Sequence, residues 1–144
     1  MKHLLSERFG SYGLITILLL FVLFHVLVLL RILPYEMVWG GGLTDQKQMI
    51  TLELLALLVS LLMLAVVGIK AGFIPVKVKP VLLNGALWVM CGMFLLNTLG
   101  NMTSQHALEK FAFTPLTLLL SLFCYRLAIA PKKPEDERLK VPLR

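Results

Sequence analysis

The sequence predicts an all-α integral membrane protein, built as an antiparallel up-and-down bundle of four transmembrane helices. The chain of 144 residues is 58% hydrophobic and only 15% charged, with a mean hydropathy of +0.86. A soluble domain of this length is about half apolar and about a quarter charged. The apolar residues also gather in four long runs with short segments between them. We therefore expect the lipid bilayer to surround the protein.

Each of the four runs is about 20 residues long, which spans roughly 30 Å as a helix and matches the hydrocarbon thickness of a bilayer. The runs are rich in leucine and lack the alternation of a membrane β-barrel strand. They cover residues 14–33, 49–69, 81–100 and 111–130. We treat 1–130 as one transmembrane domain, and we expect the charged, proline-containing segment 131–144 to be a disordered cytoplasmic tail.

The first run has basic residues before it, Lys2 and Arg8, as a signal peptide would. Its apolar stretch is longer than that of a signal peptide, and no small-residue cleavage site follows. Arg31, Pro34 and Tyr35 close the run instead. We interpret this segment as a retained anchor helix.

The connection between the second and third runs is short and carries turn residues. Gly72 is placed to end one helix, and Pro75 and Pro80 frame the turn that follows. Connections this short make successive helices antiparallel neighbours. No repeat of 20–50 residues is visible, so the chain gives no basis for an inverted-repeat transporter.

The basic residues indicate the orientation of the bundle. Eleven of the 14 Lys and Arg residues fall on the side of the two termini and the 71–80 segment, and three fall on the other side. Cytoplasmic segments carry this excess of positive charge. The sequence thus predicts a multi-pass membrane protein with both termini in the cytoplasm. Because the charge flanks the apolar runs, it does not indicate nucleic-acid binding.

No residue pattern predicts a cofactor or a metal. Cys91 and Cys124 both lie inside apolar runs and form no C-x-x-C pair, so we expect buried thiols. His25, Glu53 and His106 come from separate segments and lack the spacing of metal ligands.

The strongest polar residues within the apolar runs all fall in the half away from the termini. Polar groups inside a bilayer are costly and tend to carry function. We therefore expect an outward-facing polar pocket for a small ligand or a lipid headgroup. Its candidate binding residues are His25, Arg31, Glu53, Asn97, Asn101 and His106.

Each of these residues also has a purely structural interpretation. His25 could be a hydrogen-bonded interior histidine, and Glu53 could form a structural ion pair with Arg31. Asn97 and Asn101, one helical turn apart, could serve only as interhelical hydrogen-bonding groups.

The segment after the first run has the composition of a lid. Tyr35 and Trp39 suit the membrane interface, where aromatic residues gather. Gly40 and Gly41 allow positive φ and a close approach of the backbone. We expect this segment to fold back over the pocket.

Several short motifs resemble a family of small four-helix bacterial inner-membrane proteins of unknown function. They are V-W-G-G at 38–41, Glu53, N-T-L-G-N at 97–101, E-K at 109–110 and F-T-P-L-T at 113–117. The resemblance covers the four runs and excludes the tail. It implies a bacterial source and a shared outer site, and it implies no particular chemistry.

Three functions remain open from the sequence. The first is a non-enzymatic accessory or sensing subunit that binds a ligand at the outer polar residues, alone, as a homo-oligomer or with a partner membrane protein. The second is an oligomeric transporter or channel for ions or small solutes. The third is an intramembrane enzyme, for which no catalytic residues can be named.

Overall fold

The computed structural model describes residues 7–33, 45–104, 107 and 109–130. It contains four long helices: α1 (Glu7–Leu29), α2 (Gln46–Ala71), α3 (Pro80–Thr103) and α4 (Thr114–Ala128), with a short π-helix η3 (Glu109–Phe113) directly before α4. All four transmembrane segments, the last of them Lys110–Ala128, are long and apolar enough to cross a membrane. The predicted fold class is confirmed, and the chain is a multi-pass membrane protein.

The helices differ from the predicted ranges mainly at their ends. α1 begins at Glu7 and stops at Leu29, because Arg31 takes a left-handed φ of 59° that cannot continue a helix. α2 and α3 each extend beyond their apolar runs into polar residues. Hydropathy marks where a helix meets lipid, whereas the helical hydrogen bonds continue into the interface.

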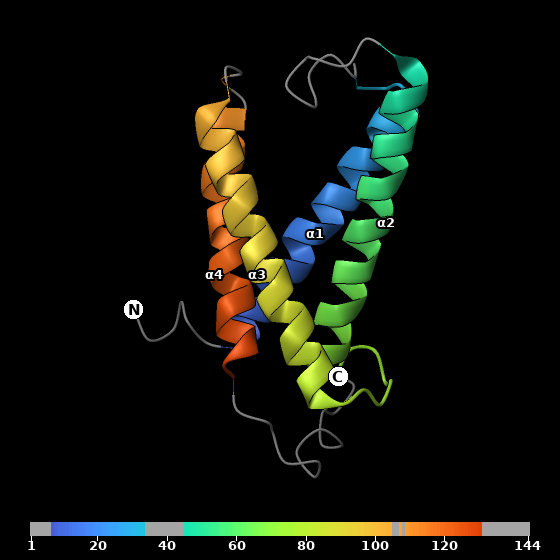
Figure 1. Ribbon diagram of the computed structural model, residues 1–144. Helices are drawn as coiled ribbons and strands as arrows, with labels where there is room; N and C mark the ends of the chain where they lie inside the picture. The colour runs from blue at the N-terminus through green and yellow to red at the C-terminus, as the bar shows by residue number, and fades with distance from the viewer. Residues whose placement is uncertain (1–6, 34–44, 105–106, 108, 131–144) are drawn as a thin grey trace.

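The helices form two antiparallel pairs, with α1 packed on α2 and α3 packed on α4. A further contact between α1 and α4 joins the pairs. Figure 1 shows the two pairs close together at the end that carries the 72–79 connection and farther apart at the other end. We call these the terminal end, where α1 begins and α4 ends, and the opposite end.

The crossing of α1 and α4 depends on small residues near the start of α1. A Cβ atom on Gly13 would lie 2.5 Å from the ring of Phe123, and one on Gly10 would lie 3.0 Å from Leu127. The Phe9 ring meets the Phe123 ring edge-on at 5.9 Å. Small residues let two membrane helices approach closely in this way.

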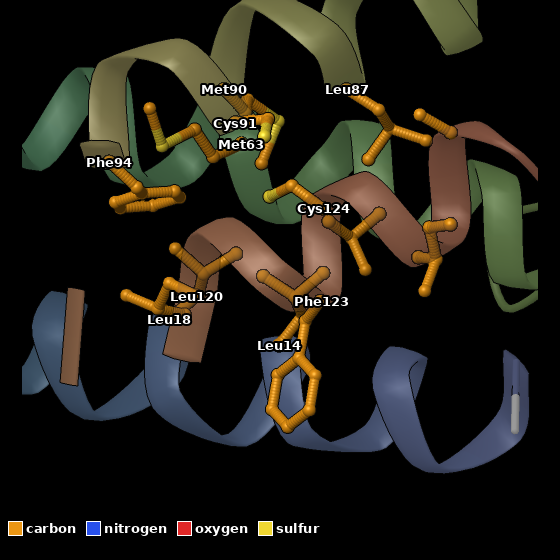
Figure 2. Close-up of a cluster of buried hydrophobic side chains, with 13 residues drawn as sticks. Leu14, Leu18, Met63, Leu87, Met90, Cys91, Phe94, Leu120, Phe123 and Cys124 are labelled. Atoms are coloured by element: carbon orange, nitrogen blue, oxygen red, sulfur yellow. The ribbon is translucent and has the colours of Figure 1, made fainter. Parts of the chain in front are cut away.

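The main hydrophobic core lies in the half of the bundle nearer the terminal end. Figure 2 shows side chains from α1, α2, α3 and α4 meeting there. Lipid acyl chains are as apolar as these side chains, so burying the side chains gives little hydrophobic gain in a membrane. Close packing between the helices stabilises such a core instead. Its buried members are Leu14, Leu18, Met63, Val67, Leu87, Met90, Cys91, Phe94, Leu120, Phe123, Cys124, Leu127 and Ala128.

The turn between the pairs is fixed by Gly72, as the sequence predicted. Gly72 adopts φ 87°, and its N–H donates to the carbonyl of Ile69 while that of Phe73 donates to Gly68. These bonds satisfy carbonyls that a helix end leaves unpaired. Across the turn, Lys70 Nζ donates to Asn84 Oδ1 at 2.7 Å, which ties the end of α2 to the start of α3.

Candidate functional site

A histidine and a glutamate meet between α1 and α2 inside the membrane-spanning region. His25 Nδ1 lies 2.7 Å from Glu53 Oε2. Glu53 is 1% exposed and the His25 side chain 16% exposed. Two of the six predicted binding residues are thus brought together. Arg31 was one expected partner of Glu53, but the structure places the imidazole of His25 against the carboxylate.

Apolar side chains cover this pair on the side of the opposite end. Val28, one turn beyond His25, and Met49, one turn before Glu53, are both buried and form a second small cluster. Phe24, Leu33 and Ile50 pack against it. The Glu53 carboxylate is buried, and the partly exposed imidazole is the accessible member of the pair.

The second helix pair reaches this region through an aromatic contact. The rings of Phe24 and Phe113 meet edge-on with centroids 6.2 Å apart, and the Phe24 ring also contacts that of His25 at 5.7 Å. Phe113 is the last residue of η3, directly before Thr114 and Pro115. Proline clashes with the carbonyl four residues earlier, and π-type turns relieve such strain and often occur near functional sites.

Two threonines form the polar contact between α3 and α4 in this half. Thr98 Oγ1 lies 2.9 Å from Thr117 Oγ1, and each hydroxyl also bonds the carbonyl four residues earlier in its own helix. Both side chains are buried. Of the predicted asparagines, Asn97 is exposed and Asn101 is half-buried. The hydroxyl pair therefore occupies the interhelical position that the sequence assigned to the two amides.

The remaining predicted site residues lie apart from the His25–Glu53 pair or cannot be placed. Arg31 is exposed, two residues after α1 ends. Among the described residues, neither Arg31, Asn97 nor Asn101 makes a hydrogen bond to the pair. The other predicted positions, namely His106 and the lid residues Tyr35, Trp39, Gly40 and Gly41, lie outside the described residues, as does the 131–144 tail.

The chemistry of the pair follows from its geometry. A distance of 2.7 Å between an imidazole nitrogen and a carboxylate oxygen requires one proton between them. With Glu53 ionised, Nδ1–H donates to it, and a neutral imidazole then carries its free lone pair on Nε2. That nitrogen can accept a hydrogen bond or a proton. Within the described ranges, no three His, Cys, Asp or Glu side chains gather as a metal site would require.

Sequence reasoning missed a second interhelical contact nearer the middle of the bundle. Ser121 Oγ donates to the backbone carbonyl of Cys91 at 3.0 Å and lies 3.3 Å from its Sγ. Both residues are buried. Serine and cysteine scarcely change the hydropathy of an apolar run. The contact can be recognised only once it is known which face each helix turns toward the other.

The chain matches no protein-family model, no curated protein and no solved structure.

Proposed function

We propose that this protein is a non-enzymatic accessory or sensing subunit that binds a small polar molecule or a lipid headgroup at His25. Glu53 holds the imidazole with Nε2 free to accept, so a group bearing an N–H or O–H donor is the favoured ligand. The observation that carries the proposal is the 2.7 Å contact between a buried carboxylate and a partly exposed imidazole in a membrane span. Ionisable residues in such places are rare and usually functional.

Charge supports the proposed setting in a bacterial inner membrane with both termini in the cytoplasm. Arg8, Lys70, Lys77, Lys79 and Arg126 are at the terminal end of the bundle, as expected for a cytoplasmic face. The opposite end, nearer to His25, then faces outward. The motif resemblance to small bacterial inner-membrane proteins agrees with this setting.

Thermal unfolding in detergent tests the ligand proposal. Short-chain phosphatidylethanolamine offers an ammonium donor, whereas the choline analogue offers none. We expect phosphatidylethanolamine to raise the midpoint temperature of unfolding of the wild-type protein more than the choline lipid does. The His25→Phe variant should lose this difference, because the ring remains and its nitrogens are gone.

A polar pair at the other end provides the matched control. Asn84→Leu removes the acceptor of the Lys70 bond and leaves His25 untouched, so its response to ethanolamine headgroups should match the wild type. Equal shifts from both lipids in wild type and in folded His25→Phe would contradict the proposal.

A second function, an oligomeric transporter that moves protons, is favoured by the same exchangeable proton between His25 and Glu53. Reconstituted vesicles with an internal pH dye would then acidify under an imposed gradient. His25→Phe should abolish this flux while Asn84→Leu preserves it. Vesicles as tight as protein-free ones would exclude this function.

A further inference from the structure

An apolar groove, here the α1–α2 groove, opens near the terminal end of the bundle and has a volume of about 350 Å³. Ile15 and Leu19 line it from α1, and Leu64 lines it from α2. His25 does not line the groove, and it follows the last lining residue of α1, Leu19, by six residues, or roughly 9 Å at helical rise. The groove extends over the eight residues from Tyr12 to Leu19, or roughly 10 Å at helical rise.

The end of α2 gives the groove its shape. Gly68 leaves room for Ile74, since a Cβ on Gly68 would lie 2.9 Å from the Ile74 Cδ1 atom. The chain therefore turns back beneath α2, and the rings of Tyr12 and Phe73 meet edge-on at 5.6 Å. Tyr12 brings the one hydroxyl group among the lining side chains. A tyrosine at this level suits the boundary between lipid chains and headgroups.

Exposed basic residues flank this end of the groove. Arg8 precedes Tyr12 by one turn and so lies on the same side of α1. Lys77 and Lys79 follow the lining residues Phe73 and Ile74 in the connection to α3. In the described part of the terminal end, Glu7 alone is acidic, so the local charge favours an anion.

We propose that the α1–α2 groove binds one acyl chain of an anionic phospholipid, with the lipid phosphate held among Arg8, Lys77 and Lys79. An apolar channel that meets a positive rim at interface depth fits a molecule with a hydrocarbon chain and a negative head. A second copy of this chain fits less well, because its own basic rim would be brought against the first. Each basic group near a membrane surface contributes about a fivefold gain in affinity for anionic lipid.

Native mass spectrometry of the full chain tests the proposal with phosphatidylglycerol and phosphatidylcholine of identical acyl chains. The wild-type protein should retain phosphatidylglycerol in preference to phosphatidylcholine. Leu64→Trp fills the groove and should abolish retention of the preferred lipid. Arg8→Gln/Lys77→Gln/Lys79→Gln should lower the preference at least roughly tenfold, while the acyl chain still binds.

Matched controls separate the groove from ordinary surrounding lipid. Val89→Trp adds the same bulk to an exposed position on α3, and Lys47→Gln/Lys110→Gln removes charge at the opposite end. Both variants should retain phosphatidylglycerol as the wild type does. If Leu64→Trp does not yield a helical, monodisperse protein, Leu19→Trp fills the groove from the α1 side.

Three results would overturn the proposal. They are equal retention of the two lipids by the wild type, unchanged retention in a folded groove-filled variant, or a change from dimer to monomer on filling the groove. The last would make the groove an interface between copies. None of these measurements depends on His25, so they are independent of the proposed function.

Discussion

His25 and Glu53 show how a polar pair is accommodated within an apolar bundle. Each group alone would be costly in lipid, and together they share one proton at 2.7 Å. The carboxylate is the more deeply buried of the two and has apolar side chains above it. The site therefore presents an imidazole whose orientation is fixed by a residue that a ligand cannot reach directly.

Removing both partners should destabilise the protein by less than the sum of the two single losses. His25→Leu or Glu53→Leu leaves the other polar group buried without this partner, which costs about 1–3 kcal/mol. The double variant should lose less than the sum, with a coupling energy of roughly 0.6–2 kcal/mol, the range seen for hydrogen bonds between membrane helices. Reversible unfolding in mixed detergent micelles measures the free energy of unfolding of the wild type, the two single variants and the double variant. Additive losses would show that the contact contributes nothing.

At the residue scale, the sequence predicted how far along the bundle a polar residue lies better than it predicted which residue it contacts. Their positions in the apolar runs predict that His25 and Glu53 both lie in the half away from the termini, and the structure has them there. Position along a helix, however, does not say which way a side chain faces in the bundle. Asn97 points outward and its neighbour Thr98 inward, because one residue of rotation separates them. The pairing of the Thr98 and Thr117 hydroxyls was not predicted, since hydropathy barely registers a threonine.

At the scale of single elements, the four apolar runs predicted the helices well and their ends less well. Turn residues gave the best local signals: Gly72 ends α2 with a positive φ, and Pro80 begins α3. The π-helix before α4 had no counterpart in the sequence pattern. Apolar periodicity reports 3.6 residues per turn, and one wider turn beside Pro115 is too short to alter it.

The α1–α4 crossing should be sensitive to one added methyl group. Gly13→Ala places a carbon about where the Phe123 ring already lies, so the helices must separate. Such overpacking typically costs about 1–3 kcal/mol. Gly92→Ala is the control, because a Cβ there meets nothing within 4 Å. The same micelle unfolding assay applies, and equal stabilities of the two variants would refute this account of the crossing.

At the scale of the whole molecule the bundle is divided along its length. Its main apolar core lies toward the terminal end, and the His25–Glu53 and Thr98–Thr117 contacts lie toward the other. The sequence predicted this division from the positions of its polar residues. It could not predict that the α3–α4 polar contact would remain separate from the α1–α2 pair.

Cysteine labelling tests the proposed orientation of the whole bundle. Val76→Cys and Gln48→Cys place exposed thiols at the terminal and opposite ends, respectively. In intact bacterial spheroplasts, a membrane-impermeant maleimide should label Gln48→Cys and should reach Val76→Cys only after permeabilisation. The wild-type protein is the control, since Cys91 and Cys124 are buried. The reverse pattern would place the termini outside.

The joining of the two helix pairs chiefly near one end has a mechanical consequence. If the two pairs rotate relative to each other, the shared core is the fixed point. The portions of α1–α2 and α3–α4 beyond it then move the most. From Phe94, the last core residue of α3, to the helix end at Thr103 this portion is roughly 14 Å long, so a rotation of about 10° displaces its tip by roughly 2 Å. The Phe24–Phe113 ring contact joins the two pairs beyond this core, and the Phe24 ring also touches His25, so such a rotation would change the surroundings of His25 first.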